Sequence, residues 1–299
     1  TETVAKPDGS SVTKVEQGDG SASTTTVTQT GRVESEVQLS QSAVDTSENG
    51  TVTLPIPAVS AGEERSEAPT VTVTLPADTT ARVEVPVESV TPGTVAILVK
   101  PDGTEEVLKA SLTTENGVAV TLSGGETIKI VDNSKSFDDV EEAHWGADAI
   151  DYASSRELLA GTGANTFSPE GEMTRAMVVT VLARYEGVDT STGENWYDAG
   201  LQWAVENGVS DGTSLHDAVS REQLAAMLWR YAGSLTPAGG TEAFVDSGRV
   251  SPWATQAMAW AVENGIIRGV GKDTLDPQGS ASRAQVARIL MNFAQLGLN

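Results

Sequence analysis

Three arginines occupy the same place in three similar segments of the C-terminal half, each directly after a hydroxyl residue: Thr174-Arg175, Ser220-Arg221 and Ser282-Arg283. We expect the hydroxyl residue to cap a helix and the arginine to take its first helical position. Unpaired N–H groups and the helix dipole favour an anion there, and the guanidinium adds a planar fork that fits a carboxylate. The pattern therefore predicts an anionic ligand at these arginines. The alternative is a pair with an acid of the same chain, such as Asp139, Asp246 or Glu222.

Three tryptophans, Trp145, Trp196 and Trp253, precede these arginines at the start of each segment. An indole ring combines a large apolar face with a polar tip, so each of them would stack on a sugar ring. The competing interpretation is packing between repeats, because each tryptophan opens an alanine-rich stretch with aliphatic residues at helical spacing.

A glycine lies sixteen residues after each of these tryptophans, at Gly161, Gly212 and Gly269, and the first and third are followed by Gly163 and Gly271. We expect these glycines to adopt positive φ where the first helix of each segment ends. A second use would be close approach of a sugar to bare backbone. The predicted ligand-binding set therefore consists of the three arginines, the three tryptophans and these five glycines.

Catalytic chemistry finds little support in the sequence. The two histidines, His144 and His216, occupy unrelated places in their repeats, with no nucleophile motif nearby. Acidic pairs such as Asp138-Asp139 are neighbours in sequence, whereas a glycosidase pair needs a defined separation across a cleft. The chain has no cysteine and no EF-hand pattern. We expect no catalytic residue, no metal site, no cofactor and no enzyme activity.

The tryptophan-to-arginine segment occurs three times, which is typical of a repeat array whose units pack on their neighbours. After each arginine, apolar residues recur at i, i+3, i+4 and i+7, as on the buried face of a helix. Ser220 with Gln223 and Ser282 with Gln285 form predicted capping boxes, whereas Met177 leaves the first box open. We place the repeats at 136–187, 188–233 and 243–299.

The first repeat has Phe137-x-Asp139-Val140 before Trp145 and ends in Thr174-Arg175-Ala176, and the third has Phe244-Val-Asp246 before Trp253 and Ser282-Arg283-Ala284. With these motifs, residues 136–299 resemble the S-layer homology domain. The family's T-R-A-E glutamate is replaced by Met177, Gln223 and Gln285. The second repeat lacks an F-x-D start and is five residues shorter between its glycine and its arginine.

The resemblance implies an all-α trimer of repeats around a pseudo-threefold axis. It further implies non-covalent anchoring of an exported protein to the bacterial cell wall. Such domains bind secondary cell-wall polysaccharide attached to peptidoglycan, often through a pyruvylated sugar. Two other functions stay open: the anchor end of a larger extracellular enzyme, and an S-layer subunit that self-assembles into a lattice.

In the N-terminal half, apolar residues recur every second position, as in strands, and not with the helical period of the C-terminal half. Val71, Val73 and Leu75 alternate with threonine, and prolines punctuate residues 31–133, which predicts an all-β sandwich-like domain there. Half of residues 1–30 are Ser, Thr or Gly. A flexible linker is expected for this segment, with polar hairpins at Asp8-Gly9 and Asp19-Gly20 as the alternative.

The net charge of −23 is shared evenly, with 9 basic and 20 acidic residues in 1–135 and 10 and 22 in 136–299. Such a balance disfavours nucleic acid, whose phosphates require clustered Lys and Arg. The sequence has no run of 18 apolar residues, so we expect no membrane insertion. The chain begins at Thr1 without an apolar leader, so we expect a mature or truncated product of an extracellular, wall-associated bacterial protein.

Overall fold

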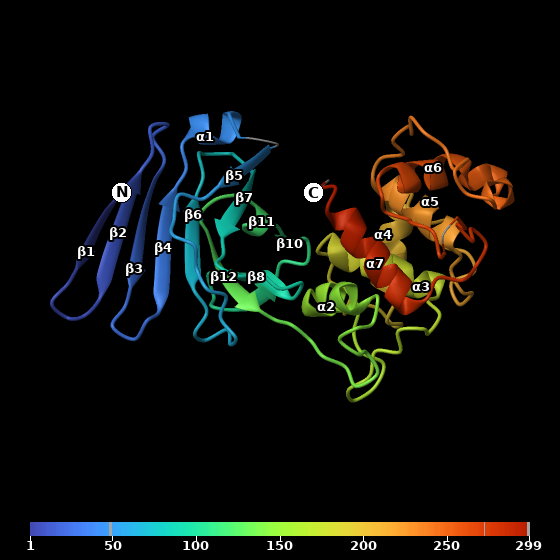
Figure 1. Ribbon diagram of the computed structural model, residues 1–299, viewed down its shortest axis with the longest axis horizontal. Helices are drawn as coiled ribbons and strands as arrows, with labels where there is room; N and C mark the ends of the chain where they lie inside the picture. Colours follow the sequence, from blue (N-terminus) through green and yellow to red (C-terminus); the bar gives the residue numbers. More distant parts are fainter. Residues whose placement is uncertain (48–49, 272, 298–299) are drawn as a thin grey trace. The chain divides into compact units, whose positions relative to one another are not determined.

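The computed structural model describes residues 1–47, 50–271 and 273–297. The chain divides into two compact units, Thr1–Lys135 and Ser136–Asn299. The first unit consists mainly of strands and the second mainly of helices (Figure 1).

The first unit contains two β-sheets. The larger has the strand order β1-β2-β3-β4-β6-β12-β8-β9, and the smaller has the order β10-β11-β7-β5. Most neighbours are antiparallel, but β4 with β6 and β5 with β7 are parallel. The strands are β1 (Glu2–Ala5), β2 (Ser11–Glu16), β3 (Ala22–Val27), β4 (Val33–Gln38), β5 (Thr51–Thr53), β6 (Thr70–Thr74), β7 (Ala81–Pro86), β8 (Thr94–Val99), β9 (Glu105–Val107), β10 (Leu112–Thr113), β11 (Gly117–Leu122) and β12 (Glu126–Asp132).

Alternating valines of the two sheets form one core. Val71 and Val73 of β6 are completely buried, as are Val83 and Val85 of β7, and they belong to the same apolar cluster. The threonines between the β6 valines stay partly exposed. The two-residue period therefore sorts each strand into a buried face and a wetter face, as the sequence predicts.

Residues 1–30 are not a flexible linker, so that expectation is wrong and the hairpin alternative holds. They form β1, β2 and β3, joined by turns at Gly9 and Gly20 with φ of +86° and +90°. The Asp8 carboxylate accepts a hydrogen bond from Ser10 N at 2.9 Å and so closes the first turn. The meander needs no apolar face of its own because β4 joins it to the core strand β6.

The second unit contains α2 (Ala147–Ser155), α3 (Arg175–Tyr185), α4 (Asp198–Glu206), α5 (Arg221–Tyr231), α6 (Thr255–Glu263) and α7 (Arg283–Ala294), with short 3₁₀ turns η2 (Ser247–Arg249) and η3 (Pro252–Ala254). Each of α3, α5 and α7 begins at its arginine, with the preceding hydroxyl as N-cap. The two predicted capping boxes are confirmed at α5 and α7, and Thr174 alone caps α3.

The helices pair between repeats rather than within them. The first-repeat helix α2 packs on α7 of the third repeat, α4 packs on α3, and α6 packs on α5. Isolated β-bridges also join the segments before the arginine helices, at Glu172 with Ser282, Thr174 with Ala218 and Ser220 with Ser280. The apolar stripe of one repeat is therefore covered by a helix of another.

The expected fold class, an all-β sandwich-like domain followed by an all-α pseudo-threefold trimer of repeats, is wrong. The first unit contains a short helix, α1 (Gln41–Asp45), and its eight-stranded sheet extends to an edge strand, β1, that is exposed along its whole length. The second unit adds β-bridges and 3₁₀ turns to its helices, so it is not an all-α trimer. The repeats pack on their neighbours, as the repeated sequence predicts, but the apolar period states which face of a helix is buried and not which helix covers it.

Candidate functional site

The three arginines at the helix starts are buried and reach into loops of another repeat. Arg221 is 3 % exposed; its Nε donates to Leu275 O and its Nη2 to Arg268 O, both at 2.7 Å. Burial lowers the pKa of its guanidinium. Arg221 thus ties the start of α5 to the loop of the third repeat.

Arg283 makes the corresponding contacts with the first repeat. Its Nε donates to Phe167 O at 2.8 Å and its Nη2 to Ala160 O at 2.5 Å. Its guanidinium carbon lies 4.4 Å from the centre of the Phe167 ring, in cation–π contact. Burial lowers the pKa of Arg283. Its two hydrogen bonds to main-chain oxygens make this arginine an internal donor as well.

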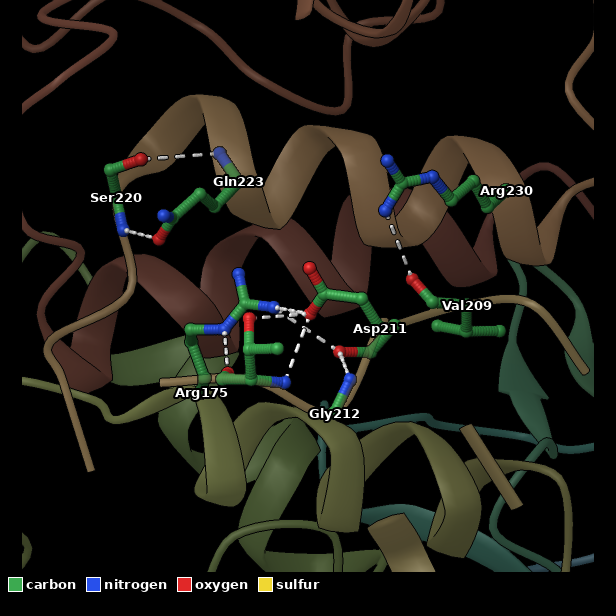
Figure 2. A network of polar contacts seen from close by, with 9 residues as sticks. Arg175, Val209, Asp211, Gly212, Ser220, Gln223 and Arg230 are labelled. Carbon is green, nitrogen blue, oxygen red and sulfur yellow. Dashed lines mark hydrogen bonds and ion pairs between the residues drawn. The ribbon is translucent and has the colours of Figure 1, made fainter. Parts of the chain in front are cut away.

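Arg175 reaches the second repeat and meets a carboxylate there. Its Nε donates to Thr213 O at 2.9 Å, and its Nη2 donates to Asp211 Oδ1 at 2.7 Å. Figure 2 shows the two side chains pointing toward one another, with the Ser220 and Gln223 capping box on the neighbouring helix. The pKa of Asp211 is lowered, first by the Thr213 N–H and also by the charge of Arg175.

The acids named as alternative partners of the three arginines accept hydrogen bonds from other groups. Asp139 accepts hydrogen bonds from Phe167 N and Ser168 N, at 2.8 and 2.7 Å, and these donors lower its pKa. Asp246 accepts from two backbone N–H groups in the matching loop of the third repeat, and Glu222 accepts from Ser251. Among the described residues none of the three forms an ion pair with the arginines. Direct ligand contact by Arg175, Arg221 and Arg283 stays a prediction.

The three tryptophans at the helix starts are exposed, at 51 % for Trp145, 53 % for Trp196 and 55 % for Trp253. Packing between repeats does not cover them, so each keeps much of its indole surface open to solvent. Trp145 and Trp253 each line a surface groove.

The first groove, which we call groove one, combines elements of all three repeats and has a volume of about 510 Å³. Trp145 comes from the first repeat, Arg221 from the second, and the α7 surface from the third. Its lining is Trp145, Glu170, Arg221, Ile266, Arg268, Gly269, Val270, Gln285, Arg288, Ile289 and Asn292. Three guanidinium groups against one carboxylate make this groove cationic.

The second groove, groove two, repeats this plan with the repeats exchanged and has a volume of about 310 Å³. Trp253 comes from the third repeat, Arg175 from the first and the α5 surface from the second. Its lining is Arg175, Asp211, Thr213, Ser214, Gln223, Ala226, Met227, Arg230 and Trp253. The repeated sequence thus places an indole next to a buried arginine twice, through residues distant in sequence.

Two of the predicted glycines are required by close approach rather than by φ. A Cβ on Gly161 would lie 2.8 Å from Thr166 O and 3.2 Å from the Phe137 ring, and one on Gly269 would lie 2.8 Å from Thr274 O. Of the five, Gly212 alone has positive φ, at +75°. The expectation of positive φ is therefore wrong for Gly161, Gly163, Gly269 and Gly271, because their loops fold back on themselves.

The glycines that end first helices were missed. Gly208 after α4 and Gly265 after α6 both have a φ of +66°, and Glu157 has this conformation after α2. The Glu-Asn-Gly sequences at 206–208 and 263–265 were the available signal. Groove residues Arg268 and Arg288 were also missed, since they occur in one repeat only and have no counterpart that a repeat pattern would highlight.

The histidines do not join a cluster with catalytic geometry. His144 Nε2 lies 3.7 Å from Glu170 Oε1, and His216 packs edge-on against Tyr197. Within residues 1–47, 50–271 and 273–297, no three His, Asp or Glu side chains gather as a metal site. No helix in the same ranges has the length and apolar character needed to cross a membrane.

Comparison with known proteins identifies the helical unit. The family model of the S-layer homology domain matches residues 136–176 and 243–287. These two stretches match S-layer homology domains, as the motifs of the first and third repeats predict. The short repeat at 188–233 lies outside both matches.

Relatives include bacterial surface proteins and enzymes. The chain is 26% identical over 188 residues to S-layer protein sap of Bacillus anthracis, covering 58% of this chain and 23% of that protein. It is 27% identical over 178 residues to an amylopullulanase of Thermoanaerobacterium thermosulfurigenes (54% and 10%). It is 23% identical over 179 residues to a cellulosome-anchoring protein of Acetivibrio thermocellus (60% and 30%).

The chain thus spans less than a third of the length of these relatives. The family match and the S-layer relatives indicate a location at a bacterial cell surface or cell wall.

Proposed function

We propose that this chain anchors an exported protein to the bacterial cell wall by binding secondary cell-wall polysaccharide in its helical unit. The observation that carries the proposal is groove one, where the exposed Trp145 indole lies beside three arginines. Five of the ten basic residues of 136–299 line grooves one and two, against two of its 22 acidic residues. In a strongly acidic chain, such concentration of guanidinium groups favours an anionic ligand.

The chemistry matches an acidic sugar, such as one carrying a pyruvyl ketal. An indole face accepts the apolar face of a pyranose ring, and a guanidinium binds a carboxylate with two parallel hydrogen bonds. Because both grooves bring these groups together, one polymer would engage the unit at more than one point. The resulting avidity would suit anchoring, since linked weak contacts give tight overall binding.

We further propose that the chain itself contributes no catalysis. Amylopullulanase and exoglucanase are named among the relatives, and the matched stretch is a tenth to a fifth of their lengths. This favours a second candidate function, in which the chain is the anchor portion of a larger extracellular enzyme. A lattice-forming surface-layer subunit is the other, motivated by the S-layer relatives.

Sedimentation with purified cell walls tests the anchoring proposal. The whole chain is mixed with walls that retain their secondary polymer and with walls from which it has been extracted. We expect co-sedimentation with the first and loss of binding to the second. Equal binding to both would show that peptidoglycan is the ligand and would contradict the proposal.

A further inference from the structure

Grooves one and two differ in charge at three corresponding positions. Fifteen residues after the tryptophan of the repeat stands Arg268 in the third repeat and Asp211 in the second. Six residues after the N-cap stands Arg288 on α7 and Ala226 on α5. These two differences put a cation in groove one where groove two has an acid or a methyl group, whereas ten residues after the N-cap groove one has Asn292 and groove two has Arg230.

Resting on the proposed polysaccharide function, we propose that groove one selects the acidic sugar, with Arg268 and Arg288 as its specificity-determining residues. Groove two, which has fewer cations, then holds the polymer with a smaller contribution from charge. Groove one thereby binds the anionic sugar, and groove two binds a neighbouring sugar of the same polymer.

The buried arginine is not the main ligand cation in groove one. Nε and Nη2 of Arg221 already donate to two carbonyls at 2.7 Å. The Arg268 guanidinium is exposed and, among the described residues, forms no ion pair. An exposed, uncommitted guanidinium can reorient toward a carboxylate, whereas a buried donor that leaves Leu275 O would strand that carbonyl.

Arg288 is held where a sugar on the Trp145 indole would meet it. Its Nη2 donates to Trp145 O at 2.6 Å, which fixes the side chain against the backbone of the stacking residue. The remaining guanidinium N–H groups are free to face the groove. Glu170 opposes them with one carboxylate, but the groove keeps a net positive lining.

Groove two has a smaller surplus of cations. The carboxylate of Asp211 accepts from Arg175 at 2.7 Å and neutralises it. Arg230 Nη1 donates to Val209 O at 3.4 Å, so this guanidinium is partly engaged on the groove wall (Figure 2). An anion would therefore meet two cations and one carboxylate in groove two, and three cations and one carboxylate in groove one.

The test compares Arg288→Gln and Arg268→Gln in groove one with the same change at Arg230 in groove two and at the exposed Arg249, which lines neither groove. Each whole chain is titrated with native walls and with walls treated with mild acid, which removes ketal-linked pyruvate. We expect each groove-one variant to bind native walls about 10-fold to 100-fold more weakly, since a charge-assisted contact is lost. Arg230→Gln should weaken binding less than either groove-one variant does, and Arg249→Gln, the control, should change it by less than about threefold.

On acid-treated walls the groove-one variants should bind like the unaltered chain, because the anion that they recognise is gone. Tryptophan fluorescence melts check that each variant is folded, since Arg268 is exposed and Arg288 is half-buried.

Three outcomes overturn the proposal. Native-wall binding that is unaffected by either groove-one change would remove selection by these arginines. A larger loss for Arg230→Gln would move selection to groove two. Equal losses on native and acid-treated walls would show that the arginines act on something other than the acidic group. If the unaltered chain fails to bind native walls at all, the polysaccharide function falls, and this inference falls with it.

Discussion

Arg175 Nη2 lies 2.7 Å from Asp211 Oδ1, whereas the same nitrogen of Arg221 binds the main-chain oxygen of Arg268. The acceptor changes from carbonyl to carboxylate between repeats, but the connection from helix start to neighbouring loop is kept. The shorter loop of the second repeat is thus held by an ion pair. This pair is half open to water, since the Asp211 side chain is 67 % exposed and that of Arg175 is 10 % exposed.

Replacing Asp211 by alanine should destabilise the helical unit modestly, by about 1 kcal/mol or less, because solvent screens an exposed partner. The pKa of Asp211 is lowered in the folded chain, so its contribution is present at neutral pH. It should disappear as pH falls below about 4, through the folded-state pKa. Urea unfolding at pH 7 and pH 3 measures both effects through tryptophan fluorescence, since all six tryptophans lie in the helical unit.

The exposed acid Glu142 provides the control. Glu142→Ala should leave the midpoint unchanged at pH 7, whereas Asp211→Ala lowers it. A difference between Asp211→Ala and the unaltered chain that persists unchanged at pH 3 would contradict an ionic origin.

Replacing Arg283 by alanine should destabilise the helical unit by about 2–4 kcal/mol, because the buried oxygen of Phe167 and the partly buried oxygen of Ala160 lose charge-assisted donors. Lysine should restore only part of this, since it has no planar fork for two acceptors. Thermal melts followed by tryptophan fluorescence check the loss. A variant that melts like the unaltered chain but no longer binds walls would show that Arg283 acts on the ligand.

Replacing Trp145 by alanine should weaken wall binding while leaving stability within about 0.5 kcal/mol, because a half-exposed side chain contributes little to the core. Co-sedimentation with native walls measures the first effect and a thermal melt the second. Trp260→Ala is the matched control, since that indole is buried at 2 % exposure and packs on Phe293. It should lower the melting temperature strongly. Unchanged wall binding by the folded Trp145 variant would remove the indole from the site.

The sequence predicts where helices start and which face of a strand is buried better than it predicts which residues contact each other between repeats. The starts of α3, α5 and α7 follow from a hydroxyl cap before an arginine, and the buried face of β6 follows from valine alternating with threonine. The partner of Arg283 does not follow, because Phe167 O and Ala160 O belong to another repeat more than 110 residues away. Main-chain acceptors carry no sequence signal, so acids such as Asp139 were the partners that side-chain chemistry suggested.

The composition of residues 1–30 led to the wrong prediction of a flexible linker. Few apolar residues there suggested a segment that cannot fold, but β3 pairs with β4, which pairs with the buried strand β6. Sheet growth from an existing edge needs backbone hydrogen bonds rather than a new core. The Asp-Gly turns were the signal that favoured hairpins.

Truncation after Gly233 should unfold the remaining helical repeats, although it leaves the first two intact in sequence. It removes α7, on which α2 packs, and α6, on which α5 packs. It also removes Leu275 and the carbonyl of Arg268, the two acceptors of the buried Arg221. An uncovered apolar face and a stranded buried cation each cost more than a domain of this size can spare.

Far-UV circular dichroism and tryptophan fluorescence of the chain 1–233 check this result against the chain 136–299. We expect 136–299 to melt cooperatively, since it has its own core. The chain 1–233 should keep its strand signal, lose helical signal and show red-shifted, non-cooperative tryptophan emission. A cooperative tryptophan transition of chain 1–233 at the midpoint of chain 136–299 would mean that the first two repeats fold without the third, contrary to the packing of α2 on α7 and of α5 on α6.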